Sequence, residues 1–586
     1  MKIRLDLNKR DLLTIVVLSA VFFSLAVWNL GLSQAPVNGW RTTENESFYI
    51  DLGEERSIGT VYFLVKNGSA DVQVYTGLPD SWSTSGSLSI SASYYAWAEV
   101  DVNDLSRYLR VELEPTTSIE LAEVAVLSPD NQMITVTEVT GEDYSDPNLS
   151  RLVDEQNLVQ LPPTYMEETY FDEIYFVKSA EQYLNLQVPY EWTHPPLGKL
   201  ILASGIVAFG YNPFGWRIMG VIAATLMIPV IYVLGKKLLG TWIGASAAAF
   251  LLAFDFMHFT MARMATADTY VVFFSLASQL FFLIYLKDVL KNGWNAPVQP
   301  LFLAFVFFAL GFSTKWVVLY GFAAQLAILV VLRLREVAKV KKGWLDKLNT
   351  FSNHPYAMVL GFSLVAVLIY FLTYIPDMLA GRSIIEVVNL QGSMYGYHST
   401  LTATHPFSSP WWNWPLMLKP LWLDVWYLPG NVKSTIVLLG NPAVWWIGFT
   451  AIIFTILSIA NIVIPFFFRW LWKKITKSSS PVKSISQKLD FPAMFIITFF
   501  FFQWVPYVFI SRVTFIYHFY VNVPFLCLAS AYFISKYWSN KWVKVAAIAY
   551  FAVTVAMFGL FYTVISGMPA SDSWIESLKW FESWVF

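Results

Sequence analysis

A series of long apolar segments constrains the fold of this 586-residue chain more than any other feature. A helix needs roughly 20 apolar residues to cross the hydrocarbon core of a bilayer, and about eleven segments approach that length. Hydrophobic residues make up 56% of the chain and charged residues 14%, whereas soluble domains carry about 25% charged residues. The sequence therefore predicts an α-helical polytopic membrane protein and excludes a disordered chain or an ordinary cytosolic enzyme. The predicted spans are residues 11–33, 216–235, 240–255, 269–286, 298–314, 316–333, 356–375, 441–466, 490–510, 516–535 and 543–565.

The charge balance and the cysteine content exclude two kinds of protein. The 39 basic residues nearly balance the 41 acidic ones, so the chain lacks the basic excess of a nucleic-acid-binding protein, and no nucleic-acid partner is expected. Cys527 is the single cysteine, which excludes a disulfide framework and a metal site built from several cysteines.

Basic residues also predict the orientation. Those within residues 2–10 precede the first apolar segment, as in a signal peptide, but the run ends in Asn29-Leu-Gly-Leu-Ser-Gln-Ala, a poor cleavage site, so a retained anchor is favoured. With the amino terminus in the cytoplasm, the basic runs 333–347 and 469–488 fall inside, as the positive-inside rule requires. An odd number of spans then places the carboxyl terminus outside.

A polar stretch of about 180 residues separates the first two predicted spans, far more than a simple loop needs. Within residues 36–135, short alternating or apolar runs are separated by turn-forming residues, which predicts an extracytoplasmic β-sandwich inserted after the first helix. Asp51-Leu-Gly, the region of Trp97 and Arg107-Tyr-Leu-Arg-Val-Glu-Leu resemble discoidin-like (coagulation factor 5/8 type C) galactose-binding modules. That resemblance implies a carbohydrate ligand, and a structural spacer is the alternative. Three sequons lie on the same predicted outer side, at Asn45, Asn67 and Asn148.

Ionisable residues beside membrane spans are costly and therefore mark candidate functional residues, and here they gather at the predicted outer ends. Each has a plainer interpretation: the stretch around Asp172 fits a surface helix, Arg263 and Asp268 could pair with each other, and Lys315 could extend its amine to the interface. Together, however, they place carboxylates and cations on one side of the membrane. Such a site suits group transfer from a lipid phosphate, because the lipid tail stays in the bilayer while its head reaches the interface. The candidates are Asp172, Glu173, His194, Arg263, Asp268, Lys315, Trp316, His405, Lys419, Arg512 and His518.

A set of motifs across residues 165–565 carries a family resemblance. The motifs are Phe171-Asp-Glu-Ile-Tyr-Phe, His194-Pro-Pro-Leu-Gly-Lys, Arg263 with Asp268, Gly311-Phe-Ser-Thr-Lys-Trp, Tyr397-His-Ser-Thr-Leu-Thr-Ala-Thr-His-Pro, Trp414-Pro-Leu-Met-Leu-Lys-Pro-Leu-Trp and Arg512-Val-Thr-Phe-Ile-Tyr-His. In this order they resemble the protein O-mannosyltransferase family of the C-type glycosyltransferase (GT-C) superfamily. Ile174-Tyr-Phe replaces the usual Val-His-Phe, and the MIR modules of eukaryotic members are absent, so the chain resembles a prokaryotic member.

The resemblance implies a GT-C fold, a polyprenyl- or dolichyl-phosphate-mannose donor, a Ser/Thr hydroxyl of an exported protein as acceptor, and inversion at the sugar carbon. We expect Asp172 to be the general base, Glu173 to position the acceptor or to brace Asp172, and Asp268 to orient Arg263 or the sugar. No cofactor is required, since cations can stabilise the leaving phosphate, although the Asp172/Asp268 pair would suit a hard divalent cation. The expected phosphate ligands are Lys315, Arg512 and Arg263, and the expected substrate-binding residues are His194, His405, Lys419, His518 and Trp316.

The resemblance also divides the chain. The expected regions are a first transmembrane helix (1–35), the discoidin-like β-sandwich (36–135), an outer loop with the acidic motif and juxtamembrane helices (136–215), a catalytic transmembrane core (216–375), an outer loop with His, Trp and Lys motifs (376–440) and a C-terminal four-helix region (441–586). The run 199–211 is too short to cross and is expected to be a juxtamembrane helix on the outer surface.

Three other functions compete with this interpretation. The first is a GT-C glycosyltransferase that modifies a lipid or a cell-surface polysaccharide, like the aminoarabinose transferases of lipid A. The second is a transporter, although transporter sites lie near the bilayer midplane between internal repeats, whereas these charges crowd the outer rim. The third is a non-catalytic adhesion protein, which the acidic and basic motifs argue against.

Overall fold

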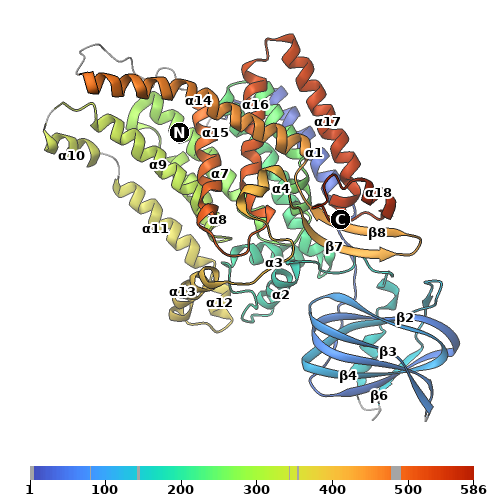
Figure 1. Cartoon of the computed structure of the whole chain (residues 1–586). Helices are drawn as coiled ribbons and strands as arrows, with labels where there is room; N and C mark the ends of the chain where they lie inside the picture. Colours follow the sequence, from blue (N-terminus) through green and yellow to red (C-terminus); the bar gives the residue numbers. More distant parts are fainter. Residues whose placement is uncertain (1–4, 80, 142–145, 342, 353–355, 477–489) are drawn as a thin grey trace.

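The computed structural model describes residues 5–79, 81–141, 146–341, 343–352, 356–476 and 490–586. It contains a bundle of apolar helices and a β-domain (residues 40–141) that lies against one end of the bundle (Figure 1). We call this end of the bundle the β-domain end.

Every predicted span coincides with helix in the structure, which confirms a multi-pass membrane protein. Among the described residues, eight helices are long and apolar enough to cross a membrane, and the bent pair α5–α6 would make a ninth. Two shorter apolar helices of 14 and 17 residues, α8 and α11, cover the remaining predicted spans. The bounds are α1 (Lys9–Val27), α4 (Pro213–Leu239), α5 (Trp242–Ala253), α6 (Phe256–Ala262), α7 (Asp268–Asn292), α8 (Gln299–Phe312), α9 (Val318–Val337), α11 (Tyr356–Leu372), α14 (Pro442–Thr476), α15 (Phe491–Trp504), α16 (Val523–Lys536) and α17 (Lys541–Ser566).

The break between α5 and α6 has a polar cause. The two helices bend by 57°, and Asp255 lies in the break. One Asp255 oxygen accepts a hydrogen bond from the His258 N–H at 3.1 Å and so caps α6, while the other accepts from the indole of Trp445 at 2.8 Å. Because a buried carboxylate needs such partners, Asp255 fixes the bend that leads the chain to the start of α7.

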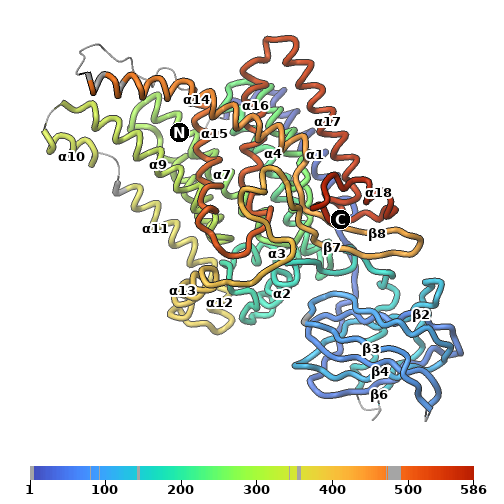
Figure 2. The backbone as a smooth tube through the Cα atoms, viewed as in Figure 1, coloured from blue at the N-terminus to red at the C-terminus, as the bar shows by residue number. Residues whose placement is uncertain are grey.

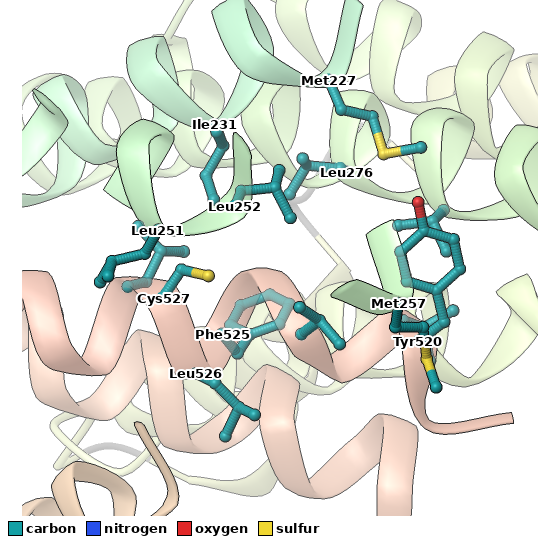
Figure 3. Packing of buried hydrophobic residues seen from close by; sticks show 14 of the residues in the cluster. Met227, Ile231, Leu251, Leu252, Met257, Leu276, Tyr520, Phe525, Leu526 and Cys527 are labelled. Carbon is teal, nitrogen blue, oxygen red and sulfur yellow. The ribbon is translucent and has the colours of Figure 1, made fainter. Parts of the chain in front are cut away.

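The centre of the bundle is packed by side chains from distant parts of the chain. Figure 3 shows Met227 and Ile231 of α4, Leu252 of α5, and Phe525 and Cys527 of α16 in one apolar cluster. All five side chains are buried, and the lone cysteine is buried in this core. This packing holds α4, α5 and α16 against one another. It thereby fixes the helix ends near which the candidate residues lie.

The β-domain is a six-stranded antiparallel sheet in the order β1-β4-β2-β3, with β5 paired to β4 and β6 to β2. The long strands β2 and β4 bend at several β-bulges, so that Thr60 pairs with both Asp101 and Leu127. The sheet therefore folds around one apolar core, to which Phe48, Val111 and Val124 contribute. The bounds are β1 (Trp40–Thr42), β2 (Glu46–Leu78), β3 (Ser81–Ser93), β4 (Ala96–Leu127), β5 (Met133–Ile134) and β6 (Glu138–Gly141).

The β-domain extends beyond the predicted boundary at residue 135. Strand β6 pairs with β2, and Leu149 and Leu152 of the 3₁₀ turn η1 (Pro147–Leu152) complete the apolar core. The sequence prediction ended too early because this last strand has only four residues. The β structure after the first helix is confirmed, and the discoidin-like identity stays a prediction.

Short elements between the spans gather at the β-domain end of the bundle (Figure 2). The juxtamembrane helix predicted at 199–211 is α3. The hairpin β7–β8, in contrast, was not predicted, although Pro429-Gly-Asn between its strands is a turn signal. The bounds are α2 (Glu173–Leu184), α3 (Leu197–Phe209), α12 (Ile375–Leu379), α13 (Ile384–Thr400), β7 (Leu421–Leu428), β8 (Val432–Leu438), β9 (Ala570–Ser571) and α18 (Asp572–Ser577), with α10 (Trp344–Ser352) between α9 and α11.

Candidate active site

Asp172 lies at the start of α2, where the backbone makes an unusual turn. The preceding residue, Phe171, has φ of +50°, a left-handed conformation that a bulky side chain adopts at a cost of roughly 1–3 kcal/mol. Edge contacts of its ring with His405 (6.3 Å) and Phe515 (6.4 Å) hold it in place. The turn thus presents Asp172 between α2 and two segments from the carboxyl-terminal half of the chain.

Glu173, the neighbour of Asp172, is fully engaged within the protein. Its two carboxylate oxygens accept hydrogen bonds from Arg217 at 2.9 and 2.7 Å, and both side chains are completely buried. The same carboxylate also accepts from the Ala265 N–H at 2.7 Å. This bidentate pair ties α2 to α4 and to the segment before α7, directly beside Asp172.

The Asp172 carboxyl is placed where a proton can be exchanged near neutral pH. Burial raises the pKa of Asp172 to about 7; the positive charge of Lys315 opposes that rise, and the charges of Asp268 and Glu191 add to it. No side-chain hydrogen bond holds the Asp172 carboxylate among the described residues. A carboxylate with a pKa near the working pH and with free oxygens is suited to act as a general base.

Lys315 and Asp268 form the second part of the site. Lys315 Nζ lies 2.9 Å from Asp268 Oδ1, and the two side chains are 14% and 16% exposed, so the pair stays accessible. The sequence left open a pairing of Asp268 with Arg263, but Asp268 pairs with Lys315 instead. The ammonium of Lys315 also lies 5.3 Å from the centre of the Tyr517 ring.

Tyr517 marks the point where the charged residues meet. Its phenol lies within electrostatic range of Asp172, Asp268 and Arg512. Arg512 in turn lines an open cavity of about 400 Å³, together with Tyr507, Thr514 and residues 401–404. Groups predicted as base and phosphate ligands therefore converge around one tyrosine at the β-domain end of the bundle.

The His194-Pro-Pro turn borders the site and is fixed by a buried ion pair. Lys199 Nζ lies 2.7 Å from Glu191 Oε2 and also donates to the His194 carbonyl at 2.9 Å. Burial disfavours the ionised carboxylate, but Lys199 and His194 outweigh it and hold the pKa of Glu191 well below its usual range. His194 Nδ1 lies 3.0 Å from Glu191 Oε1, which sets the orientation of the imidazole.

His398 contacts this turn from α13. Its Nε2 lies 2.9 Å from the Thr193 carbonyl, so this nitrogen carries the proton. Burial, together with the nearby charges of His194, Arg512 and Lys315, lowers the pKa of His398 to about 4. His398 is therefore neutral at pH 7, and its role is to connect α13 to the turn.

An apolar pocket of about 440 Å³ opens beside Lys315. Aromatic side chains of α8, α9 and α11 line it, and Trp316, the residue after Lys315, forms part of its wall. The Trp316 indole donates to the Tyr370 hydroxyl at 3.1 Å. The aromatic lining consists of Phe305, Phe308, Phe312, Trp316, Phe322, Tyr370 and Phe371.

Arg263 does not join the charged residues around Tyr517. Its guanidinium donates to the carbonyls of Ala26, Trp28 and Asn29 at 2.8, 2.7 and 2.6 Å, and it is 4% exposed. It therefore binds the open carbonyls at the end of α1, which need partners. The predicted phosphate contact of Arg263 finds no support in this geometry.

The remaining predicted substrate ligands are His405, His518 and Lys419. His405 stacks edge-on against Phe515 at 5.1 Å, and its Nδ1 accepts from the Phe407 N–H. His518 is buried and lies parallel to the Trp414 ring at 5.9 Å. Lys419 is half-buried and makes no side-chain hydrogen bond or ion pair among the described residues.

Sequence reasoning missed Arg217, Glu191 and Tyr517 as site residues. Glu191 and Lys199 stood in a quoted motif, and a carboxylate and a lysine eight residues apart across two prolines could have indicated a pair. Tyr517 stood in the quoted motif that begins at Arg512 but was not singled out. Arg217 carried no such signal, because it is an isolated charged residue in the first half of the apolar helix α4. Their importance comes from partners far away in the chain.

Two family models match the chain. Residues 193–371 match the family model of dolichyl-phosphate-mannose-protein mannosyltransferase, and residues 384–584 match that of the C-terminal four-TMM region of protein-O-mannosyltransferase. The polyprenol-phosphate-mannose–protein mannosyltransferase of Mycobacterium tuberculosis is 26% identical over 333 residues, which are 47% of this chain and 63% of the relative. The Corynebacterium glutamicum protein of the same name is 25% identical over 318 residues, covering 45% and 60%.

A solved structure supports the fold. The Saccharomyces cerevisiae protein O-mannosyltransferase Pmt1-Pmt2 complex bound to the sugar donor aligns with a TM-score of 0.54 and 14% identity, over 71% of this chain and 89% of that chain. The chain spans about three fifths of the length of the curated relatives it matches. Because the two family models together match most of the chain, residues 193–371 and 384–584, the chain belongs to the protein O-mannosyltransferase family.

Proposed function

We propose that this protein transfers mannose from a polyprenyl phosphate carrier to Ser or Thr hydroxyls of exported proteins, with inversion at the sugar carbon. The observation that carries the proposal is the convergence of Asp172, the Lys315–Asp268 pair and Arg512 around Tyr517. The names of the relatives supply the sugar, the carrier and the protein acceptor.

Asp172 acts as the general base. It takes the proton of the acceptor hydroxyl while that oxygen forms a bond to the anomeric carbon. The bond between the anomeric carbon and the phosphate oxygen breaks on the opposite face, so the configuration inverts. The products are the mannosylated side chain, the lipid phosphate and a protonated Asp172, and a base of this kind typically contributes about 10²–10⁴-fold.

Lys315 and Arg512 stabilise the leaving phosphate. A phosphate oxygen is a good leaving group when cations balance its charge, and cations already in place need no reorganisation during the reaction. Lys315 is held by Asp268 at 2.9 Å, so it is oriented before the donor arrives. Arg512 lines the open cavity and interacts electrostatically with Tyr517.

The apolar pocket beside Trp316 holds the first part of the prenyl chain. Its walls are almost entirely aromatic or aliphatic, and burying such a chain gives about 0.8 kcal/mol per CH₂ group. In this proposal the phosphate lies at the mouth of the pocket and contacts Lys315, which precedes the lining residue Trp316 in the chain. With the amino terminus in the cytoplasm, this mouth and the β-domain face the extracytoplasmic side of the cell membrane.

A reconstituted assay tests the proposal. The purified full chain is given polyprenyl phosphate carrying labelled mannose, together with a Ser/Thr-rich peptide, and the peptide is analysed by mass spectrometry. Label on a Ser or Thr side chain with the inverted configuration is the expected result. Label on a lipid or polysaccharide acceptor and not on peptide would instead support the lipid-modifying alternative, and turnover with no acceptor preference would refute the protein acceptor.

A further inference from the structure

An acidic cluster lies outside the candidate active site, where the chain enters and leaves the β-domain. Glu123 is on β4, and Asp154 and Glu155 directly precede the 3₁₀ turn η2 (Gln156–Leu158). One carboxylate oxygen of each of the three residues lies within 4.8 Å of the other two. Two oxygen ligands of one Ca²⁺ ion can be about 5 Å apart, so this spacing fits three ligands of a single ion.

Glu123 is the unusual member of the cluster. Its side chain is 0% exposed, and its Oε1 has no hydrogen-bond partner among the described residues. Its Oε2 accepts from the Glu155 N–H at 3.2 Å. An ionised carboxylate buried without a partner is costly, and no lysine or arginine of the described chain forms an ion pair with these three carboxylates. Burial and the charges of Asp154 and Glu155 raise the pKa of Glu123 to about 9.

Hydrogen bonds hold the other two carboxylates in place. Glu155 Oε2 accepts from the N–H groups of Val37 and Asn38 at 2.7 and 2.8 Å, and Asp154 Oδ2 accepts from the Asn38 amide at 3.0 Å. Within the described chain, the second oxygen of each carboxylate takes no part in these bonds. The cluster therefore joins three segments: the entry to the β-domain at Val37, its exit at Asp154, and strand β4.

We propose that Glu123, Asp154 and Glu155 bind a divalent cation of the calcium class, which fastens the β-domain to the two segments that connect it to the helices. Carboxylate oxygens are the ligands that Ca²⁺ prefers, and Ca²⁺ tolerates irregular coordination, whereas Mg²⁺ demands a near-ideal octahedron. Asp154 is exposed, so the ion can enter and water can complete its coordination. Extracellular modules with few protein ligands bind Ca²⁺ with a Kd of about 10⁻⁴–10⁻³ M, and we expect the same range.

The test uses the full chain in detergent, stripped with a chelator and titrated with CaCl₂ at pH 7.5. Calorimetry counts the bound ions, and tryptophan fluorescence follows thermal unfolding. Saturating CaCl₂ should raise the unfolding temperature of the wild type by about 5 °C. Glu123→Gln should lose one bound ion and this shift, while Glu114→Gln, which removes an exposed carboxylate from the same strand, should keep both.

Two further measurements keep the proposal falsifiable. Without calcium, Glu123→Gln should unfold at or above the temperature of the wild type, because it removes a buried carboxyl group whose Oε1 has no hydrogen-bond partner. If that variant does not fold, Asp154→Asn, which changes an exposed side chain, must lose the calcium shift instead. A wild type that binds no Ca²⁺, variants that bind as many ions as the wild type, or a wild-type stability that depends on pH between 7 and 10 but not on CaCl₂ would overturn the site and indicate a protonated Glu123.

Discussion

The ionisation of Asp172 should control the rate of transfer. With a pKa of about 7, the carboxyl is about one-tenth ionised at pH 6 and about nine-tenths ionised at pH 8. Since only the ionised form can accept the hydroxyl proton, kcat/KM should rise about tenfold from pH 6 to pH 8 and then level off. An aspartate with an ordinary pKa would give a flat profile over this range.

Replacing the base should remove both the rate and its pH dependence. Asp172→Asn is expected to lower kcat/KM about 10²–10⁴-fold and to leave a flat profile, while donor binding is retained. Initial rates with labelled donor and a Ser/Thr peptide, measured from pH 5.5 to 8.5, provide the profile, and Asp346→Asn at an exposed position of α10 serves as the control. A flat wild-type profile, or an Asp172→Asn variant with more than about a tenth of wild-type activity, would refute this reasoning, since a base contributes far more.

Three other substitutions distinguish residues that bind the donor from residues that stabilise the fold. Lys315→Ala should raise the KM for the donor about 10- to 100-fold, because a charged hydrogen bond is worth about 1.5–3 kcal/mol; an unchanged KM in donor titrations would dismiss its contact with phosphate. Arg263→Met should lower the unfolding temperature but leave the KM for the donor unchanged, since its guanidinium binds backbone carbonyls. Glu173→Gln should destabilise the fold by about 3–5 kcal/mol, the cost of leaving a buried partner unpaired, and thermal unfolding that matches the wild type would contradict the role of the Arg217 pair.

The membrane helices could be predicted from sequence because each depends on its own composition. A run of apolar residues such as 441–466 becomes a helix wherever it lies in lipid, since backbone groups there must bond within the segment. The hairpin β7–β8 could not be predicted in this way. Its strands pair with each other and with β9, more than 130 residues away, so its formation depends on tertiary context.

Part of the site could also be predicted from sequence, namely the residues that stand in recognisable motifs. Asp172, Lys315 and Arg512 stood in motifs, and the structure brings them around one tyrosine. The contacts of Glu173 and Arg263 could not be predicted from the motifs alone. A motif shows that a charged residue is present, but it does not show whether that charge contacts substrate or a buried partner. Glu173 pairs with Arg217, and Arg263 binds backbone carbonyls at the end of α1.

The segment that carries the base also joins the three parts of the protein. Glu168, four residues before Asp172, accepts hydrogen bonds from the Trp97 N–H of β4 at 3.0 Å and from the Trp426 indole of β7 at 2.6 Å. Arg217 of α4 donates to the Glu168 carbonyl at 2.7 Å. Burial and the nearby Asp424 raise the pKa of Glu168 well above its usual range.

This arrangement couples the position of Asp172 to the β-domain. The β-domain, the β7–β8 hairpin and the transmembrane bundle all bind the same few residues, so a shift of any one of them moves the turn at Phe171, whose left-handed backbone depends on contacts with His405 and Phe515. Strained turns persist only where the surrounding structure determines them. The β-domain therefore contributes to the geometry of the base without supplying a residue to the reaction.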